Sequence, residues 1–252
     1  MKKYVLVLKA LGVVAVLTAI KLVVDYLGLD VVATSPVITA IVAGVIFTIA
    51  IIFSGVLTDY KESEKIPGEL AASIKSLYRD TGVLIKINGP LAVHIREHII
   101  ELIDTISANF QNNRWRLKEI NPVTNKIDAD INTAYEKGLP PPMVVKMRNE
   151  LAAIDRLIYR VEIIMETSFI PAAYHISIIS IVAVLFILMF TRMDPYYEGI
   201  LLFGSVAFVL TSLMMLIQDM DNPFEYGKSS AADVDLKILF KLKDCLGGDR
   251  ED

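Results

Sequence analysis

Hydrophobic residues dominate four stretches of the chain, each about as long as the helix that a lipid bilayer requires. The stretches are Tyr4–Val24, Val37–Leu57, Phe169–Phe190 and Tyr197–Ile217. A helix of roughly 20 apolar residues crosses the hydrocarbon core of a membrane. Backbone polar groups that face lipid must be bonded within their own segment, so helices are expected here rather than strands. The pattern therefore predicts an all-α integral membrane protein with four transmembrane helices.

The segment between the second and third stretches has the pattern of amphipathic helices. Apolar side chains recur at three- and four-residue spacing within 91–110 and again within 144–166, as on the buried face of a helix. Prolines and asparagines predict where helices start, kink or stop. These positions are Pro67-Gly68, Gly89-Pro90, Asn112-Asn113, Asn121-Pro122 and Pro140-Pro141-Pro142.

These patterns predict four parts and an orientation. Residues 1–58 and 169–218 form two transmembrane helix pairs, 59–168 a cytoplasmic helical region, and 219–252 a cytoplasmic tail. The loop 25–36 has no Lys or Arg and the loop 191–196 has only Arg192, whereas the other connections are rich in both. Because positively charged loops stay in the cytoplasm, we expect a multi-pass protein of the cell membrane, in contact with lipid, with both termini cytoplasmic.

The composition agrees with this division and excludes several kinds of site. The chain is 54% hydrophobic and 21% charged, and residues 59–168 hold 15 Lys and Arg against 16 Asp and Glu. A nearly neutral balance lacks the clustered positive charge that nucleic acid requires. The single cysteine, Cys245, excludes an internal disulfide and a multi-cysteine zinc site. We expect no nucleic-acid partner and no cofactor.

Two lysines bracket the first stretch. Lys9 and Lys21 are about 18 Å apart along a helix that rises 1.5 Å per residue. We expect them to be interfacial anchors that reach toward opposite membrane surfaces, in preference to a role in conduction. Asp25 lies four residues after Lys21, on the same helix face.

The second stretch, Val37–Leu57, contains no charged residue. Helical spacing aligns Val45, Thr48, Ile52 and Val56 along one stripe. Such a stripe either lines a narrow pore or packs on neighbouring helices, and the spacing alone does not choose between the two.

A short motif in the middle segment is typical of zinc binding. His94, Glu97 and His98 fit the pattern H-x-x-E-H, which places two imidazoles on one helix face beside a glutamate that activates water. Glu162 or Glu166 is a candidate third ligand. The motif is short and the surrounding helix is an ordinary amphipathic one, so a non-enzymatic protein without a metal is the favoured interpretation.

The segment after the fourth stretch carries four acidic residues, Asp219, Asp221, Asp233 and Asp235. Their carboxylates predict a site at the inner mouth for permeating cations or a divalent cation. The alternative is a simple turn, because Asp-Asn-Pro favours one on its own.

Two runs of sequence resemble the bestrophin family of membrane channels. Ile52-Phe53-Ser54-Gly55-Val56 is similar to the I-F-x-G-F run of the pore-lining second helix in bacterial members. Asn222-Pro223-Phe224 with Gly227, followed by Asp233-Val234-Asp235-Leu236, resembles the N-P-F-G and D-x-D-L segment after the last membrane helix. The order of two spans, a helical middle, two spans and a tail is also bestrophin-like.

This resemblance implies a homopentameric channel with an apolar neck on its axis. Ile52 and Val56 would be neck residues, with Thr48 one turn further along. Val56 stands where the family has an aromatic residue, which implies a wider or less hydrophobic constriction. The dense acidic run of the calcium-binding members is missing, and ion selectivity is not implied.

The sequence therefore predicts an oligomeric ion channel whose second transmembrane helix lines the pore. An apolar ring of side chains of this kind can gate by dewetting. A non-conducting membrane scaffold or sensor, whose cytoplasmic helices bind a partner, is the main alternative. A membrane zinc protease that uses His94, Glu97 and His98 is a weaker one.

Overall fold

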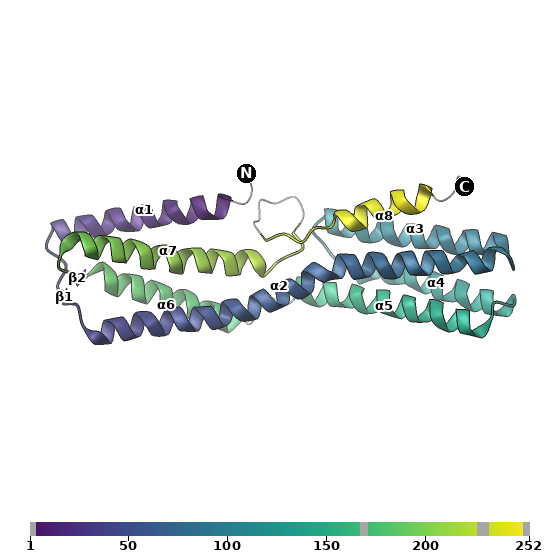
Figure 1. Cartoon of the computed structure of the whole chain (residues 1–252), viewed down its shortest axis with the longest axis horizontal. Coiled ribbons are helices and arrows are strands. Elements are labelled where there is room, and N and C mark those ends of the chain that lie inside the picture. Colours follow the sequence, from purple (N-terminus) through teal and green to yellow (C-terminus); the bar gives the residue numbers. More distant parts are fainter. Residues whose placement is uncertain (1–3, 167–170, 226–231, 249–252) are drawn as a thin grey trace. The chain divides into compact units, whose positions relative to one another are not determined.

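The computed structural model describes residues 4–166, 171–225 and 232–248, and in these ranges the chain is almost entirely helical (Figure 1). The all-α prediction is confirmed. The helices are α1 (Val5–Tyr26), α2 (Pro36–Ile85), α3 (Gly89–Gln111), α4 (Leu117–Glu136), α5 (Pro141–Glu166), α6 (Pro171–Met189), α7 (Tyr196–Met220) and α8 (Lys237–Gly248), and the strands are β1 (Val32–Ala33) and β2 (Thr191–Arg192).

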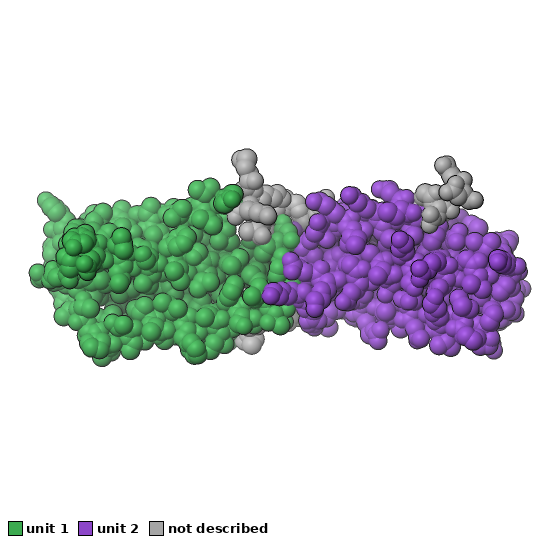
Figure 2. Space-filling view, viewed as in Figure 1, with its two compact units in different colours: residues 1–60, 168–223, 228–233 green, residues 61–167, 224–227, 234–252 purple. Residues whose placement is uncertain are grey.

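The chain forms two compact units, coloured separately in Figure 2. Unit 1 comprises Met1–Tyr60, Ser168–Pro223 and Lys228–Asp233, and unit 2 comprises Lys61–Thr167, Phe224–Gly227 and Val234–Asp252. Helix α2 contributes its first half to unit 1 and its second half to unit 2. The segment predicted as a single tail, 219–252, is divided between the two units.

Four helices of unit 1 are long and apolar enough to cross a membrane, as predicted. They are α1, the apolar part of α2, α6 and α7. The predicted start of the third span at Phe169 lies outside the described residues. These four spans make the chain a multi-pass membrane protein.

Apolar packing between the spans holds unit 1 together. Helix α7 lies along α1 and contacts α6. The buried side chains at the centre include Ile49 from α2, Leu188 from α6, and Phe203 and Leu210 from α7. A short parallel pairing of β1 with β2 joins the connection after α1 to the connection after α6. The two connections that carry few positive charges therefore lie at the same end of unit 1.

Lys21 departs from the sequence expectation, because it does not reach out to solvent. Its side chain is only 2% exposed. The ammonium donates hydrogen bonds to the Asp25 carboxylate at 2.6 Å and to the carbonyl oxygens of Met189 at 3.1 Å and Thr191 at 2.8 Å. The last carbonyls of a helix have no partner within it, and a lysine can supply one. Lys21 thus fastens the end of α6 to α1, and its pairing with Asp25 is as predicted.

Unit 2 is a bundle built from the second half of α2 and helices α3, α4, α5 and α8. Helix α4 packs against both α3 and α5, and α8 packs on α3. The predicted apolar faces are the buried ones: Ile95, Ile99, Leu102 and Ile106 on α3, and Leu151, Ile154, Ile158 and Val161 on α5. The Tyr78 hydroxyl donates a hydrogen bond to the Leu246 carbonyl at 3.2 Å and so joins α2 to α8.

Three of the five predicted break positions are confirmed, among them Gly89-Pro90, where α3 begins. Helix α3 ends just before Asn112-Asn113, and α5 begins at Pro141. Helix α2, however, continues through Pro67, so the helix start predicted there as the alternative to a kink is wrong. The break predicted at Asn121-Pro122 is also wrong, because α4 includes both residues. A proline removes only one helical hydrogen bond. The buried stripe of α2, formed by Ile66, Leu70, Ile74 and Leu77, runs past Pro67 without a gap, so tertiary packing favours a continuous helix.

Candidate functional site

The membrane-spanning part of α2 is the least covered of the four spans. In the most apolar 18-residue window of α2, only 6% of the residues are buried within the chain. The corresponding share is 22% for α1 and 28% for each of α6 and α7. The window carries no charge that would anchor it at a membrane surface. Most of this helix therefore remains available to another molecule, whether lipid or a second copy of the chain.

The predicted stripe on α2 is divided between two faces of the helix: one packs against the core of unit 1, and the other, the open face, is not covered by the chain's own helices. Val56 is 2% exposed and belongs to the core of unit 1. Val45 and Ile52 are half-buried against that core, whereas Thr48 is exposed. Val56 would have to leave this core to face a pore. The four positions therefore differ in what they can contact outside their own subunit.

Small and hydroxyl-bearing side chains accompany the apolar ones on the open face. Gly44, Ser54 and Thr58 are exposed together with Thr48, and the bulky Ile51 lies among them. The Thr48 hydroxyl donates to the Gly44 carbonyl at 2.9 Å, and the Thr58 hydroxyl donates to the Ser54 carbonyl at 2.9 Å. Small residues on a membrane helix allow close approach of other helices. Sequence spacing missed this face because it does not reveal which side the chain's own helices cover.

The N-P-F segment anchors the chain after α7. Asn222 is exposed, but Pro223 and Phe224 are buried. The Phe224 ring lies 5.5 Å from the Phe110 ring, which in turn lies 4.7 Å from Trp115. The Trp115 indole N–H donates to the Ile158 carbonyl at 3.2 Å. This aromatic row secures Phe224 within unit 2, while Gly227 lies outside the described residues.

We expect Phe224→Ala to destabilise unit 2 by about 3–4 kcal/mol, because it empties a fully buried ring site. Chemical denaturation of the purified protein, followed by the fluorescence of the single tryptophan, Trp115, measures this directly. The control is Tyr135→Ala on α4, whose ring is largely exposed and whose loss is expected to change little. Equal effects of the two substitutions would contradict an anchoring role.

The cation site of Asp219, Asp221, Asp233 and Asp235 stays a prediction, and two of these carboxylates accept backbone hydrogen bonds in the described structure. Asp219 accepts a hydrogen bond from the Ala232 amide at 3.2 Å. Asp235 accepts one from the Lys237 amide at 3.0 Å at the start of α8, which is the turn geometry that short acidic side chains favour. Asp235 belongs to unit 2, whereas Asp219, Asp221 and Asp233 belong to unit 1. Within the described residues, none of them belongs to a group of three close metal-type ligands.

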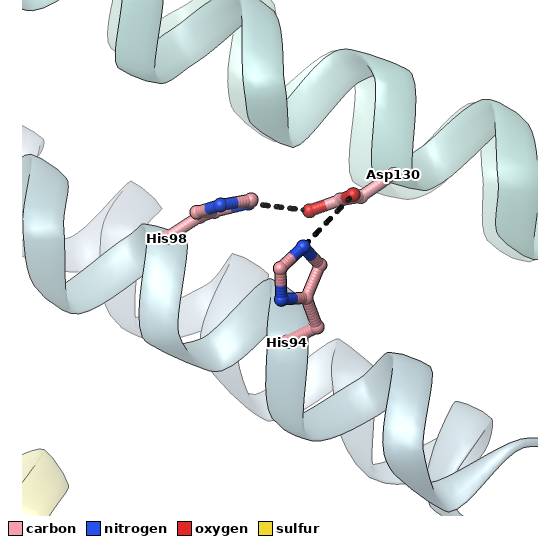
Figure 3. A group of neighbouring side chains, drawn as sticks. All are labelled: His94, His98 and Asp130. Atoms are coloured by element: carbon pink, nitrogen blue, oxygen red, sulfur yellow. Dashed lines mark hydrogen bonds and ion pairs between the residues drawn. The ribbon is translucent and has the colours of Figure 1, made fainter.

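The H-x-x-E-H residues lie on α3, but their carboxylate partner differs from the predicted one. Asp130 of α4 approaches both imidazoles, and it forms a group of close ligand atoms with His94 and His98 (Figure 3). Glu162 and Glu166, the predicted third ligands, are on α5 and are not in this group. Asp130 is 32 residues from His98 in sequence, so periodicity along one helix does not reveal their proximity.

Solved structures of a bacterial bestrophin homologue from Klebsiella pneumoniae are similar to the chain over nearly its whole length. One covers 95% of this chain and 97% of its own, at 14% identity and a TM-score of 0.79. A point mutant of the homologue covers 97% of this chain and 99% of its own, at 13% identity and a TM-score of 0.81. The chain has a bestrophin-like fold.

The bestrophin-like fold is retained here with little sequence identity. No protein-family model matches the chain, and no curated protein matches it in sequence. Helix lengths, apolar faces and turn positions specify a fold while leaving most residue identities open. The structural similarity therefore establishes the architecture of this bestrophin-like chain, and its functional residues must be argued from its own geometry.

Proposed function

We propose that this bestrophin-like chain forms a homo-oligomeric ion channel in which α2 of each copy lines the pore. The observation that carries the proposal is the exposure of α2: only 6% of the residues in the most apolar 18-residue window of its uncharged membrane segment are buried within a subunit. The bestrophin-like fold supports it, because it is the fold of a channel family. The hydroxyl and small side chains on the open face of α2 add support, since a purely lipid-facing surface has no need of them.

A pore lined by one helix per subunit requires several subunits around an axis. Closed cyclic symmetry brings the same face of each copy to the centre, and a ring of five is the assembly we propose. Thr48 is exposed and Val45 and Ile52 are half-buried, so these three positions of the predicted stripe are better placed than the buried Val56 to reach the axis. Val56 instead packs in the core of unit 1. A ring of apolar side chains excludes water when narrow, which provides a gate.

The sidedness of the channel follows from charge. We propose that unit 2 and both termini are cytoplasmic, because most Lys and Arg residues, in the middle segment, the tail and the N-terminus, lie on that side of the predicted topology. The paired loops at β1 and β2 then face the opposite side, and unit 2 forms a vestibule for ions that enter or leave the pore.

We expect purified protein in liposomes to conduct ions, and Ile52→Ala to increase its leak or open probability, because a smaller side chain weakens an apolar constriction. Single-channel recording or liposome ion flux checks this. Ile20→Ala is the matched control, because the same substitution falls on an exposed position of α1. An absence of flux from a verified oligomer would contradict conduction, and equal effects of the two substitutions would contradict the role of α2.

A further inference from the structure

Three potential metal ligands converge between two helices of unit 2. His94 and His98 are one helical turn apart on α3, and Asp130 projects from α4 between their rings (Figure 3). The His98 Nδ1 lies 2.6 Å from one Asp130 carboxylate oxygen, and the His94 Nε2 lies 4.0 Å from the other. One ligand atom of each residue lies within 4.8 Å of the other two.

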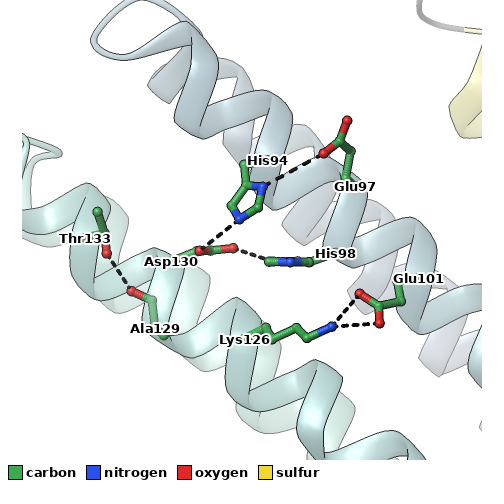
Figure 4. A network of polar contacts seen from close by, with 8 residues as sticks. All are labelled: His94, Glu97, His98, Glu101, Lys126, Ala129, Asp130 and Thr133. Carbon is green, nitrogen blue, oxygen red and sulfur yellow. Dashed lines mark hydrogen bonds and ion pairs between the residues drawn. The ribbon is translucent and has the colours of Figure 1, made fainter.

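The surroundings of these residues favour a bound cation. Glu97 lies 3.8 Å from the His94 Nδ1, the ring nitrogen that does not face Asp130 (Figure 4). A carboxylate at the outer nitrogen of a histidine is the usual support of a metal-binding imidazole. Lys126, one helical turn before Asp130 on α4, donates to both oxygens of Glu101 at 2.8 and 3.0 Å, so its charge is balanced within its own pair. The charges of Asp130 and Glu97 therefore act on a cation at this site.

We propose that His94, His98 and Asp130 bind one transition-metal ion of the zinc class and thereby cross-link α3 to α4. Two imidazoles and one carboxylate suit zinc and its neighbours, whereas calcium and magnesium require oxygen ligands. Zinc holds these ligands at about 2.0–2.2 Å with tetrahedral geometry, which sets the ligand atoms roughly 3.4 Å apart. The His94 Nε2 must therefore approach Asp130 from 4.0 Å, and the His98 Nδ1 must draw back from 2.6 Å. Side-chain rotation achieves this, because His94 is more than half exposed and its rotamer is not fixed by packing.

The role of this site is to bind a metal rather than to hydrolyse a substrate. Glu97 lies near the outer nitrogen of His94, on the side away from Asp130, and is not placed over the space that the three ligands share (Figure 4). Three protein ligands leave one position for water on the exposed side of His94. Binding ties together two helices of the bundle, so the metal stabilises unit 2 as any ligand selective for the folded state does.

The test uses the full-length protein, purified with a tag that does not depend on metal affinity and stripped with a chelator. Zinc is titrated by calorimetry, and thermal unfolding is recorded with and without zinc. We expect one zinc ion per chain and a rise in the unfolding midpoint that calcium and magnesium do not produce. Asp130→Asn and His98→Gln should abolish both effects, and Glu97→Gln should weaken zinc binding by about tenfold or more.

Two further variants keep the test decisive. His94→Ala changes an exposed side chain, so it is expected to fold normally and still lose zinc binding. His175→Gln, which removes the only other histidine, lies on α6 in unit 1 and should bind zinc as the unsubstituted chain does. The proposal is overturned if no zinc binds, or if binding persists in His94→Ala and Asp130→Asn.

Discussion

Lys21→Ala is expected to lower the unfolding free energy of the protein by about 3–5 kcal/mol, the usual consequence of removing one partner from a buried ion pair. The substitution leaves the Asp25 carboxylate, itself only 8% exposed, without its ammonium partner. It also leaves the carbonyls of Met189 and Thr191 without the donor that Lys21 provides. An unsatisfied buried acceptor costs more than the hydrogen bond itself contributes, because the group has lost its water as well.

The measurement is the midpoint of thermal or denaturant-induced unfolding in detergent, with Lys9→Ala as the matched control. Lys9 lies on the same helix and carries the same charge, but its side chain is exposed. Lys21→Met separates packing from charge, because it retains most of the stem and loses the ammonium. The account expects Lys21→Met to resemble Lys21→Ala. Unfolding midpoints that are equal for the Lys9 and Lys21 variants would show that Lys21 is only an interfacial anchor.

Modification of Thr48→Cys by a charged thiol reagent is expected to suppress most of the ion flux, because it places a permanent charge in a narrow apolar passage. Thr48 is the member of the predicted stripe that lies on the open face of α2. The native thiol, Cys245, is exposed and would also react, so the experiment requires a Cys245→Ser background. Ion flux into liposomes, recorded before and after the reagent is added, measures the effect.

Val56→Cys is the paired variant for the modification experiment. Val56 lies on the same stripe but is buried in the core of unit 1, so its thiol is expected to react far more slowly. Rapid reaction at position 56 would mean that α2 turns in the assembled channel. Reaction at position 48 without any loss of flux would place that face of α2 away from the ions and would favour a scaffold.

The architecture could be predicted from sequence because its determinants are local. Four apolar stretches of membrane length, the amphipathic periods of α3 and α5, and the breaks at Asn112-Asn113 and Pro140-Pro141-Pro142 need no tertiary information. The continuity of the helices through Pro67 and Pro122 was harder to predict. A proline ends a helix only when packing does not offset the one hydrogen bond that it removes. The continuous buried stripe of α2 provides that compensation, and it becomes visible only in the folded bundle.

The functional positions were harder to predict from the sequence, because they depend on contacts between segments that are far apart along the chain. Helical spacing placed Val45, Thr48, Ile52 and Val56 on one stripe, but only packing separates the buried Val56 from the exposed Thr48. Likewise, H-x-x-E-H identified the two histidines on α3, whereas Asp130 enters from the next helix. The surroundings of Lys21 come from residues 168 and 170 positions away, and no local signal indicated that it would be buried.

The most direct test of the pore assignment is a cryo-electron microscopy map of the full-length protein in lipid nanodiscs. The account predicts a closed ring of subunits in which copies of α2 surround the central axis, with Thr48 and Ile52 nearest to it. A single subunit, or a ring in which α2 contacts only acyl chains at the outer edge, would contradict it.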